Sequence, residues 1–252
     1  MSTAELASPT RVWTPSRVLV TRSAAERPHG RRVLARLEAA GVDRIELLSG
    51  DRLPSLRGDG DRAAFMAAKQ TLALVVPPPS LRRLQPIPPS ADWRFDLAQG
   101  CPAHCQYCYL AGSLSGPPIT RVYADLDEAL AGLDPYVGHG TVTSGTAARG
   151  AEGTTFEASC YTDPLALEHL TGGLATAITH FGTHGFPGPA QLRATTKFDD
   201  VAGLLALPHG GRTRLRFSVN AASVDRRFEG ATAKVPARIA ALSAVALSLI
   251  HI

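Results

Sequence analysis

Four strand–helix units in series occupy the chain after residue 90, and this alternation limits the possible folds more than any other feature of the sequence. Apolar residues at period two predict strands, and apolar residues at helical spacing predict helices. The predicted strand and helix of each unit are, in order, Trp93–Ala98 with Asp125–Leu133, Thr154–Cys160 with Leu165–Phe181, Gln191–Lys197 with Asp199–Leu205, and Arg212–Asn220 with a helix that starts near Pro236. Such a series predicts an α/β fold, namely a partial parallel (β/α) barrel.

Two of these strands alternate so regularly that the sequence predicts which way their side chains face. Each has one polar face and one apolar face, and the polar faces carry Gln191, Arg193, Thr195 and Lys197 on one strand and Arg214, Arg216, Ser218 and Asn220 on the other. Because the apolar faces must meet the helices, the polar faces line the interior. A packed barrel fills its interior with branched apolar side chains, so a polar interior predicts a polar ligand. For Thr154–Cys160 both parities fit the sequence.

Residues 1–90 predict a small α/β domain before the barrel. Short apolar runs predict its strands, and helical spacing predicts its helices. The elements are strands at Val18–Val20, Ile45–Leu48 and Thr71–Val76, and helices at Ala24–Ala40 and Asp61–Lys69. Prolines between residues 77 and 89 stiffen the chain and cannot donate ladder hydrogen bonds, which favours a linker. We therefore predict a domain of residues 1–90, ending near Ser90, and a barrel domain of residues 91–252.

The composition is that of a folded protein, with 44% hydrophobic and 19% charged residues, which excludes a disordered chain. The longest apolar stretch, Ile239–Ile252, is too short to span a bilayer, and the first fifteen residues lack a secretory signal. The sequence thus predicts a cytoplasmic protein without membrane contact. The net charge is +4, and 23 of the 26 cations are arginines scattered along the chain. This charge permits nucleic-acid binding without indicating it.

Three of the four cysteines, Cys101, Cys105 and Cys108, lie within eight residues of the chain directly after a predicted barrel strand. Clustered thiols in a reducing compartment indicate a metal site rather than disulfides. Three thiolates can bind three irons of a 4Fe-4S cluster and leave the fourth iron open. Zinc is the alternative, with His104 or the distant Cys160 as a fourth ligand.

Four segments in order resemble the spore photoproduct lyase family of the radical S-adenosylmethionine (SAM) superfamily. The C-x3-C-x2-C spacing, with Tyr107 before the last cysteine, is typical of the superfamily. The segments are Gly100–Leu110, Phe156–Cys160, Thr196–Lys197 and Arg214–Asn220. The resemblance covers nearly the whole chain and implies a barrel of the radical SAM type with two cofactors, a 4Fe-4S cluster and S-adenosyl-L-methionine.

The resemblance also implies a DNA-repair reaction on UV-damaged DNA. In the family, a 5′-deoxyadenosyl radical abstracts hydrogen from the thymine dimer called spore photoproduct, and the methylene bridge between the bases breaks to give two thymines. By resemblance Cys160 is the hydrogen donor, and Tyr107 and Tyr109 relay hydrogen back toward S-adenosylmethionine. The residues that resemble the family's contacts to this cofactor are Thr162, Lys197, Ser218 and Asn220. The electron is expected from a reductant such as flavodoxin or ferredoxin.

Several alternatives stay open. The enzyme could belong to the radical SAM class and act on another substrate, or the chain could be a non-catalytic Fe-S or zinc protein that binds nucleic acid. Cys160 could be an ordinary buried thiol, each tyrosine could serve only packing, and Arg214 and Arg216 could reach DNA phosphates or pair with acids inside the barrel.

The family continues well beyond the point where this chain ends, with further barrel strands and a hairpin that helps to hold the lesion. We therefore expect the C-terminal strands of the barrel to be missing and the fourth strand to have an open edge. The tail 247–252 matches a reading frame of a transposon end used in sequencing libraries, which indicates an artefact of a truncated gene. Loss of the lesion-holding residues would leave such a chain inactive in repair.

Overall fold

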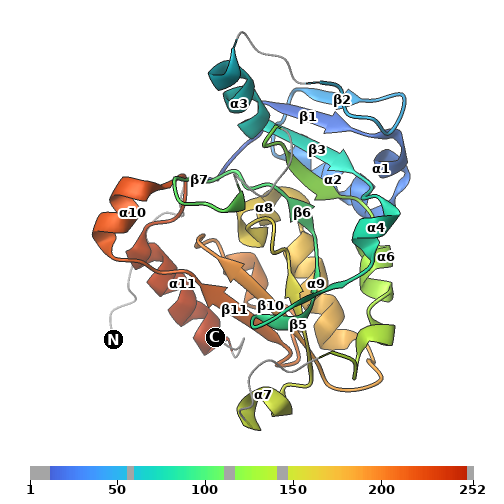
Figure 1. The fold of residues 1–252 in the computed structure, drawn as a ribbon, viewed down its shortest axis with the longest axis vertical. Helices are drawn as coiled ribbons and strands as arrows, with labels where there is room; N and C mark the ends of the chain where they lie inside the picture. The colour runs from blue at the N-terminus through green and yellow to red at the C-terminus, as the bar shows by residue number, and fades with distance from the viewer. Residues whose placement is uncertain (1–11, 56–59, 111–116, 141–146, 249–252) are drawn as a thin grey trace.

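The computed structural model describes residues 12–55, 60–110, 117–140 and 147–248, and Figure 1 shows its fold. Two of the predictions concern residues that lie partly outside these ranges. They are the prediction on a secretory signal, for residues 1–11, and the prediction of an artefactual tail, for residues 249–252. Within the described ranges, no helix is both long and apolar enough to cross a bilayer.

Five strands form the N-terminal sheet, in the order β2-β1-β3-β8-β6. They are β1 (Arg17–Val20), β2 (Ile45–Leu47), β3 (Thr71–Val75), β6 (Ala98–Gln99) and β8 (Thr120–Tyr123). All pairs are parallel except β6 with β8. Alternate residues of the central strands face opposite sides: Val18 and Leu72 pack against α2 (Pro28–Ala39), and Leu19 and Ala73 against α3 (Asp61–Lys69).

A second sheet, with the order β11-β10-β9-β5-β4, forms the partial barrel (Figure 1). Its strands are β4 (Gln85–Ile87), β5 (Ala91–Phe95), β9 (Thr154–Ala158), β10 (Ala190–Thr196) and β11 (Thr213–Phe217). β5, β9, β10 and β11 are parallel, as the four predicted units require. Its core is shared with α6 (Leu126–Ala131), α8 (Pro164–Thr171), α9 (Gly173–Thr183) and α11 (Val235–Leu247).

The proline-rich segment is more ordered than a linker. It contains α4 (Pro79–Arg82) and β4, which pairs antiparallel with β5 at the edge of the barrel sheet. An edge strand tolerates Pro86 because one side of it needs no ladder donor. The chain also returns to the N-terminal sheet through β6 and β8, so the predicted boundary near residue 90 does not separate the two sheets.

Predicted helices differ from the structure where the backbone leaves the helical region. The first splits into α1 (Arg22–Glu26) and α2, because Arg27 is extended before Pro28. Gly172, with φ +61°, divides α8 from α9, and the helix predicted at Asp199–Leu205 is only a short 3-10 turn, η2 (Ala202–Leu204). The remaining elements are η1 (Asp134–Tyr136), α7 (Ala147–Ala151), α10 (Ala222–Phe228) and the paired strands β7 (His104–Cys105) and β12 (Glu229–Gly230).

Strand polarity follows the prediction for β10 and β11. Leu192, Ala194 and Leu215 are buried in the core, so the polar residues between them face the interior. Val219 departs from the predicted apolar face: it is 52% exposed, because β11 ends at Phe217. In β9, whose parity the sequence left open, Phe156 lies in the core, so its neighbours Thr155 and Glu157 face the interior of the barrel.

Candidate functional site

A cavity of about 350 Å³ lies at the carboxyl ends of the barrel strands and brings the predicted site residues together. This volume is within the usual range for ligand pockets. The predicted residues that line it are Cys101, Cys105, Cys108, Tyr107, Tyr109, Cys160, Thr162, Lys197 and Ser218. Asn220 does not line the cavity, but its amide contacts Tyr107 at the rim.

The cysteine loop is anchored to the barrel at its start. The N–H of Gly100 donates to the carbonyl of Tyr161 over 2.8 Å, and the hydroxyl of Thr162 donates to the carbonyl of Gly100. Gly100 has φ +83°, and a Cβ there would lie 2.6 Å from the carbonyl oxygen of Ile119. Only glycine therefore fits at the point where the loop leaves the sheet.

Two segments distant in sequence hold the rest of the loop. Cys105 pairs with Glu229 in the β7–β12 ladder, and the N–H of Gln106 donates to the carbonyl of Phe228 over 2.9 Å. From the other side, the ammonium group of Lys69 donates to the carbonyl of Cys101 over 2.5 Å and to that of Ala103 over 2.6 Å.

The cysteine loop offers three thiols, which is the donor set that three irons of a 4Fe-4S cluster require. No three His, Cys, Asp or Glu side chains in the described part of the chain are grouped closely enough to hold one metal ion. Zinc would draw its ligands to about 2.0–2.3 Å from one centre, whereas each cysteine of an Fe-S cluster binds a different iron. Burial raises the pKa of the Cys101 thiol to about 12, so its proton leaves only when a metal replaces it.

Cys160 reaches the cavity through a left-handed backbone turn. Ser159 has φ +62°, a conformation that costs a non-glycine residue about 1–3 kcal/mol and that marks functional sites. The turn is fixed because the N–H of Ser159 donates to the carbonyl of Phe95 and its Oγ accepts from the N–H of Leu97, both over 2.8 Å. As a result Ser159 and Cys160 both line the cavity, although strand alternation would send them to opposite faces.

The Cys160 side chain is a protonated thiol. Burial, together with the nearby carboxylates of Glu157 and Asp96, raises the pKa of Cys160 to about 12. The sulfur therefore keeps its hydrogen at neutral pH, which a hydrogen-atom donor requires.

The two tyrosines connect different parts of the site. The hydroxyl of Tyr109 donates to the carbonyl of Cys160 over 2.5 Å. The hydroxyl of Tyr107 accepts from Lys197 and, over 2.9 Å, from Asn220, and it donates to Glu229. Tyr109 thus contacts the backbone of the candidate hydrogen donor, and Tyr107 contacts two candidate cofactor ligands.

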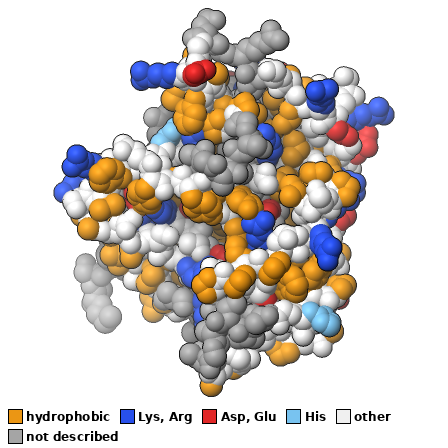
Figure 2. All heavy atoms as spheres, in the orientation of Figure 1, with side chains coloured by type: hydrophobic (Ala, Val, Ile, Leu, Met, Phe, Trp, Pro, Cys, Tyr) orange, Lys and Arg blue, Asp and Glu red, His pale blue; other side chains and the backbone are white. Residues whose placement is uncertain are grey.

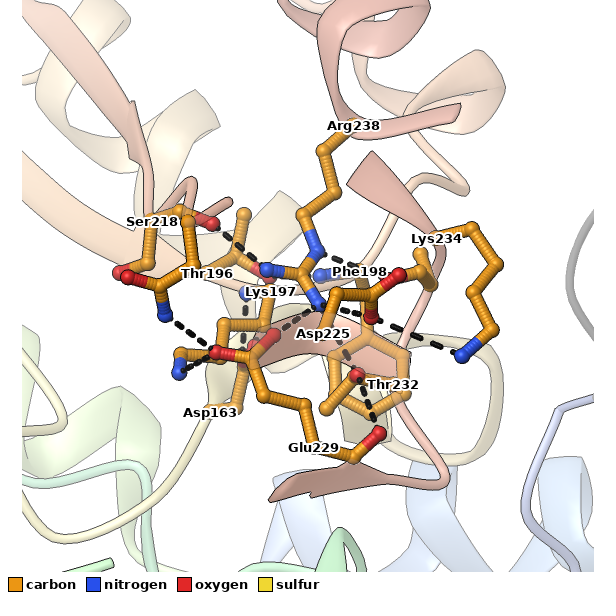
Figure 3. A network of polar contacts seen from close by, with 12 residues as sticks. Asp163, Thr196, Lys197, Phe198, Ser218, Asp225, Glu229, Thr232, Lys234 and Arg238 are labelled. Atoms are coloured by element: carbon orange, nitrogen blue, oxygen red, sulfur yellow. Dashed lines mark hydrogen bonds and ion pairs between the residues drawn. The ribbon is translucent and has the colours of Figure 1, made fainter. Parts of the chain in front are cut away.

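Glu229 is the centre of a buried polar network that holds these residues (Figure 3). One carboxylate oxygen accepts from Lys197 and from Asn220, each over 2.6 Å, and the other accepts from Arg238 over 2.5 Å. Arg238 is fully buried and also donates to the carbonyl of Ser218 over 2.8 Å. Charge-assisted bonds of this kind fix the positions of the groups that they join.

The arginines of the interior strands pair with acids. Arg216 bonds to Glu157, and Arg214 bonds to Glu152 over 2.7 Å. Arg193, which is 1% exposed, also bonds to Glu152. Of the two readings of Arg214 and Arg216, the structure therefore supports pairing inside the barrel. On the face drawn in Figure 2, Lys and Arg side chains are dispersed over several elements.

Comparison with known proteins decides the family. The sequence model of the family described as spore photoproduct lyase matches residues 13–251. The chain belongs to the spore photoproduct lyase family. It is 34% identical over 234 residues to the spore photoproduct lyase of Bacillus subtilis (strain 168) and 33% identical to that of Geobacillus sp. (strain Y412MC61). In each case the match covers 93% of this chain and 64% of the relative, so the chain spans less than two thirds of their length.

Solved structures agree with the family assignment and confirm the predicted fold class. A mutant spore photoproduct lyase with bound AdoMet and dinucleoside spore photoproduct superposes with a TM-score of 0.81 at 31% identity. A spore photoproduct lyase complexed with dinucleoside spore photoproduct gives the same values. Each match covers 94% of this chain and 66% of the solved chain.

Sequence reasoning missed several residues that shape the site. Lys69, Glu229 and Arg238 are isolated charges in unremarkable surroundings, and only the fold brings them to the cysteine loop. Asp163 had a local signal, because an acid directly before Pro164 is typical of a helix N-cap. Its carboxylate accepts from the first N–H groups of α8 and also from the hydroxyl of Thr196.

Proposed function

We propose that this chain carries the radical SAM site of a DNA-repair lyase, which reverts the spore photoproduct thymine dimer to two thymines. One observation carries the proposal: a single cavity joins the cysteine loop to the protonated thiol of Cys160, with Tyr109 and Tyr107 between Cys160 and the candidate cofactor ligands. The relatives' names and the bound molecules of the solved structures support the same reaction and substrate.

The residues present fit two cofactors. Cys101, Cys105 and Cys108 would bind three irons of a 4Fe-4S cluster. The residues that would hold S-adenosyl-L-methionine are Thr162, Lys197, Ser218 and Asn220. When bound, these cofactors supply a 5′-deoxyadenosyl radical, formed after one electron from the cluster cleaves S-adenosylmethionine. An ammonium group and hydroxyls suit the carboxylate and ribose of that cofactor, and Glu229 holds Lys197 and Asn220 ready at the rim.

Cys160 would complete the repair. After the methylene bridge breaks, one thymine carries an unpaired electron. Cys160 gives it the hydrogen of its S–H bond, which forms a C–H bond and leaves the unpaired electron on sulfur. Tyr109, whose hydroxyl bonds to the backbone of Cys160, would then give its phenolic hydrogen to that sulfur and take a hydrogen from Tyr107. Tyr107 would take its hydrogen back from 5′-deoxyadenosine, so that the unpaired electron returns to the cofactor. The bond between Tyr109 and Cys160 supports the first of these transfers.

The proposal extends to the partners. The substrate would be UV-damaged DNA, from which extrusion of the damaged bases costs a few kcal/mol. The electron would come from a reductant such as flavodoxin or ferredoxin, in the reducing cytoplasm where free thiols persist. All four cysteines of this chain are free.

The test is an anaerobic assay of the reconstituted chain with reductant, S-adenosylmethionine and a spore-photoproduct dinucleotide, which follows thymine and 5′-deoxyadenosine together. We expect 5′-deoxyadenosine from this chain alone, which spans 64% of the length of its relatives. Both products are expected when the C-terminal part of a full-length relative is joined to the chain. Cys160→Ala should keep 5′-deoxyadenosine and lose thymine recovery, whereas Cys101→Ala should lose both, because it loses the cluster. Deoxyadenosine without thymine from the joined protein would refute the substrate, and a colourless zinc protein without either product would refute the enzyme.

A further inference from the structure

Lys69 is a buried cation that connects the N-terminal sheet to the cysteine loop. It is the last residue of α3 and only 8% exposed. Its two hydrogen bonds go to the carbonyl oxygens of Cys101 and Ala103, 2.5 Å and 2.6 Å away. In Figure 1 the end of α3 lies next to the segment that carries β7.

The local structure leaves Lys69 little freedom to move. Ala68, the preceding residue of α3, is fully buried, and the hydroxyl of Thr71 donates to the carbonyl of Ala67 over 2.8 Å. Because β3 begins at Thr71 and lies in the centre of its sheet, the helix end is fixed on both sides. The sheet therefore sets the position of the ammonium group.

The negative charges that would compensate Lys69 are the cysteine thiolates of a metal-bound loop. Among the described residues, Lys69 takes part in no ion pair with a carboxylate, whereas Lys197 is paired with Glu229 and Lys234 lies near Asp225. The ammonium group of Lys69 bonds to the backbone of Cys101 itself, so thiolates that bind a metal in this loop would lie beside it. A buried charge needs a compensating charge, and bound thiolates would provide it.

We propose that Lys69 is a positioning residue of the cluster site, which fixes the backbone at Cys101 and Ala103 and raises the reduction potential of the cluster by placing a positive charge beside its thiolates. This rests on the proposed function, since it requires the cluster. Reduction adds a negative charge to the cluster, and a nearby cation in a low-dielectric site favours the form with more negative charge. The two carbonyls need a donor in either state, because unpaired buried acceptors destabilise the loop.

Redox titration of the reconstituted chain, without S-adenosylmethionine, tests the charge. We expect Lys69→Met and Lys69→Gln to shift the midpoint potential to more negative values, and Lys69→Arg to stay near the unmodified chain. Lys69→Gln keeps an amide donor for the loop, so it serves if Lys69→Met fails to fold. Lys234→Met is the matched control, because Lys234 faces Asp225 and not the cysteines, and it should leave the potential unchanged.

Iron release to a chelator tests the anchoring. Lys69→Met should lose iron several-fold faster than the unmodified chain and the Lys234→Met control. A potential for Lys69→Met and Lys69→Gln equal to that of the unmodified chain would overturn the inference while the cluster and the proposed function stand. An unmodified chain that takes up zinc and no iron would instead overturn the proposed function, and the role of Lys69 with it.

Discussion

Replacing Arg238 by methionine should destabilise the whole fold, because its guanidinium is fully buried between two acidic residues. It lies 2.5 Å from the carboxylate of Glu229 and 3.5 Å from that of Asp225. It also donates to the carbonyls of Ala233 and Ser218, both over 2.8 Å. Methionine matches the length of the apolar stem and provides none of these donors.

The expected loss of unfolding free energy follows from what the substitution leaves behind. Removing one partner of a buried ion pair costs about 3–5 kcal/mol. Glu229 keeps Lys197 and Asn220, and Asp225 keeps Lys234, which favours the low end for the charges. The two carbonyls add about 1 kcal/mol each when they lose their donor. We therefore expect a loss of about 5 kcal/mol.

Urea unfolding measures this loss. With a slope of about 2–3 kcal/mol per molar, the midpoint should fall by about 2 M. The exposed Arg226 on the neighbouring helix provides the control, and Arg226→Met should stay within about 0.5 kcal/mol of the unmodified chain. In Arg238→Met/Glu229→Gln the combined loss should be smaller than the sum of the single losses, because the two residues interact directly. A loss below about 1 kcal/mol for Arg238→Met would refute the reasoning, since it would match an exposed ion pair.

Two further predictions concern packing and pH. Gly182→Ala should destabilise the fold by about 1–3 kcal/mol or more, because a Cβ there would lie 1.6 Å from the carbonyl oxygen of Pro208. Thermal unfolding measures the loss, with Gly185→Ala as the control, since a Cβ at Gly185 would have nothing within 4 Å. Equal losses of stability in the two variants would contradict the prediction. Burial raises the pKa of Asp96 to about 6, above its value of about 4 in an unfolded chain. The folded state therefore binds the proton more tightly, and this residue makes stability fall as the pH rises from about 4 through 6. Asp96→Asn should remove that part of the pH dependence, up to about 3 kcal/mol in urea unfolding at the two ends of this range, and an unchanged pH slope would contradict the prediction.

Local patterns were sufficient wherever the chain repeats one period. The four parallel barrel strands overlap their predicted ranges, and α3 matches its predicted bounds. The end of the first predicted strand is the exception, because Ala98 lies in β6 of the N-terminal sheet. The spacing of the three cysteines likewise identified the loop, because metal-ligand spacing is a local property of sequence. Helix bounds were predicted less accurately at Arg27 and Gly172. At each position one residue with non-helical backbone angles divides a helix that periodicity predicts to be continuous.

By itself the sequence determined the order of strands and helices, the polar interior of β10 and β11 and the residues of the cysteine loop. Only the tertiary structure decided that β6 and β8 join the N-terminal sheet, that a left-handed turn at Ser159 sends Cys160 into the cavity, and that Lys69 and Glu229 hold the loop from opposite sides. The reason is physical: periodicity reports how a residue is placed relative to its near neighbours. A buried charge is stabilised by partners from any part of the chain: Lys69 bonds to a carbonyl 32 residues away. Only the folded backbone brings such partners together.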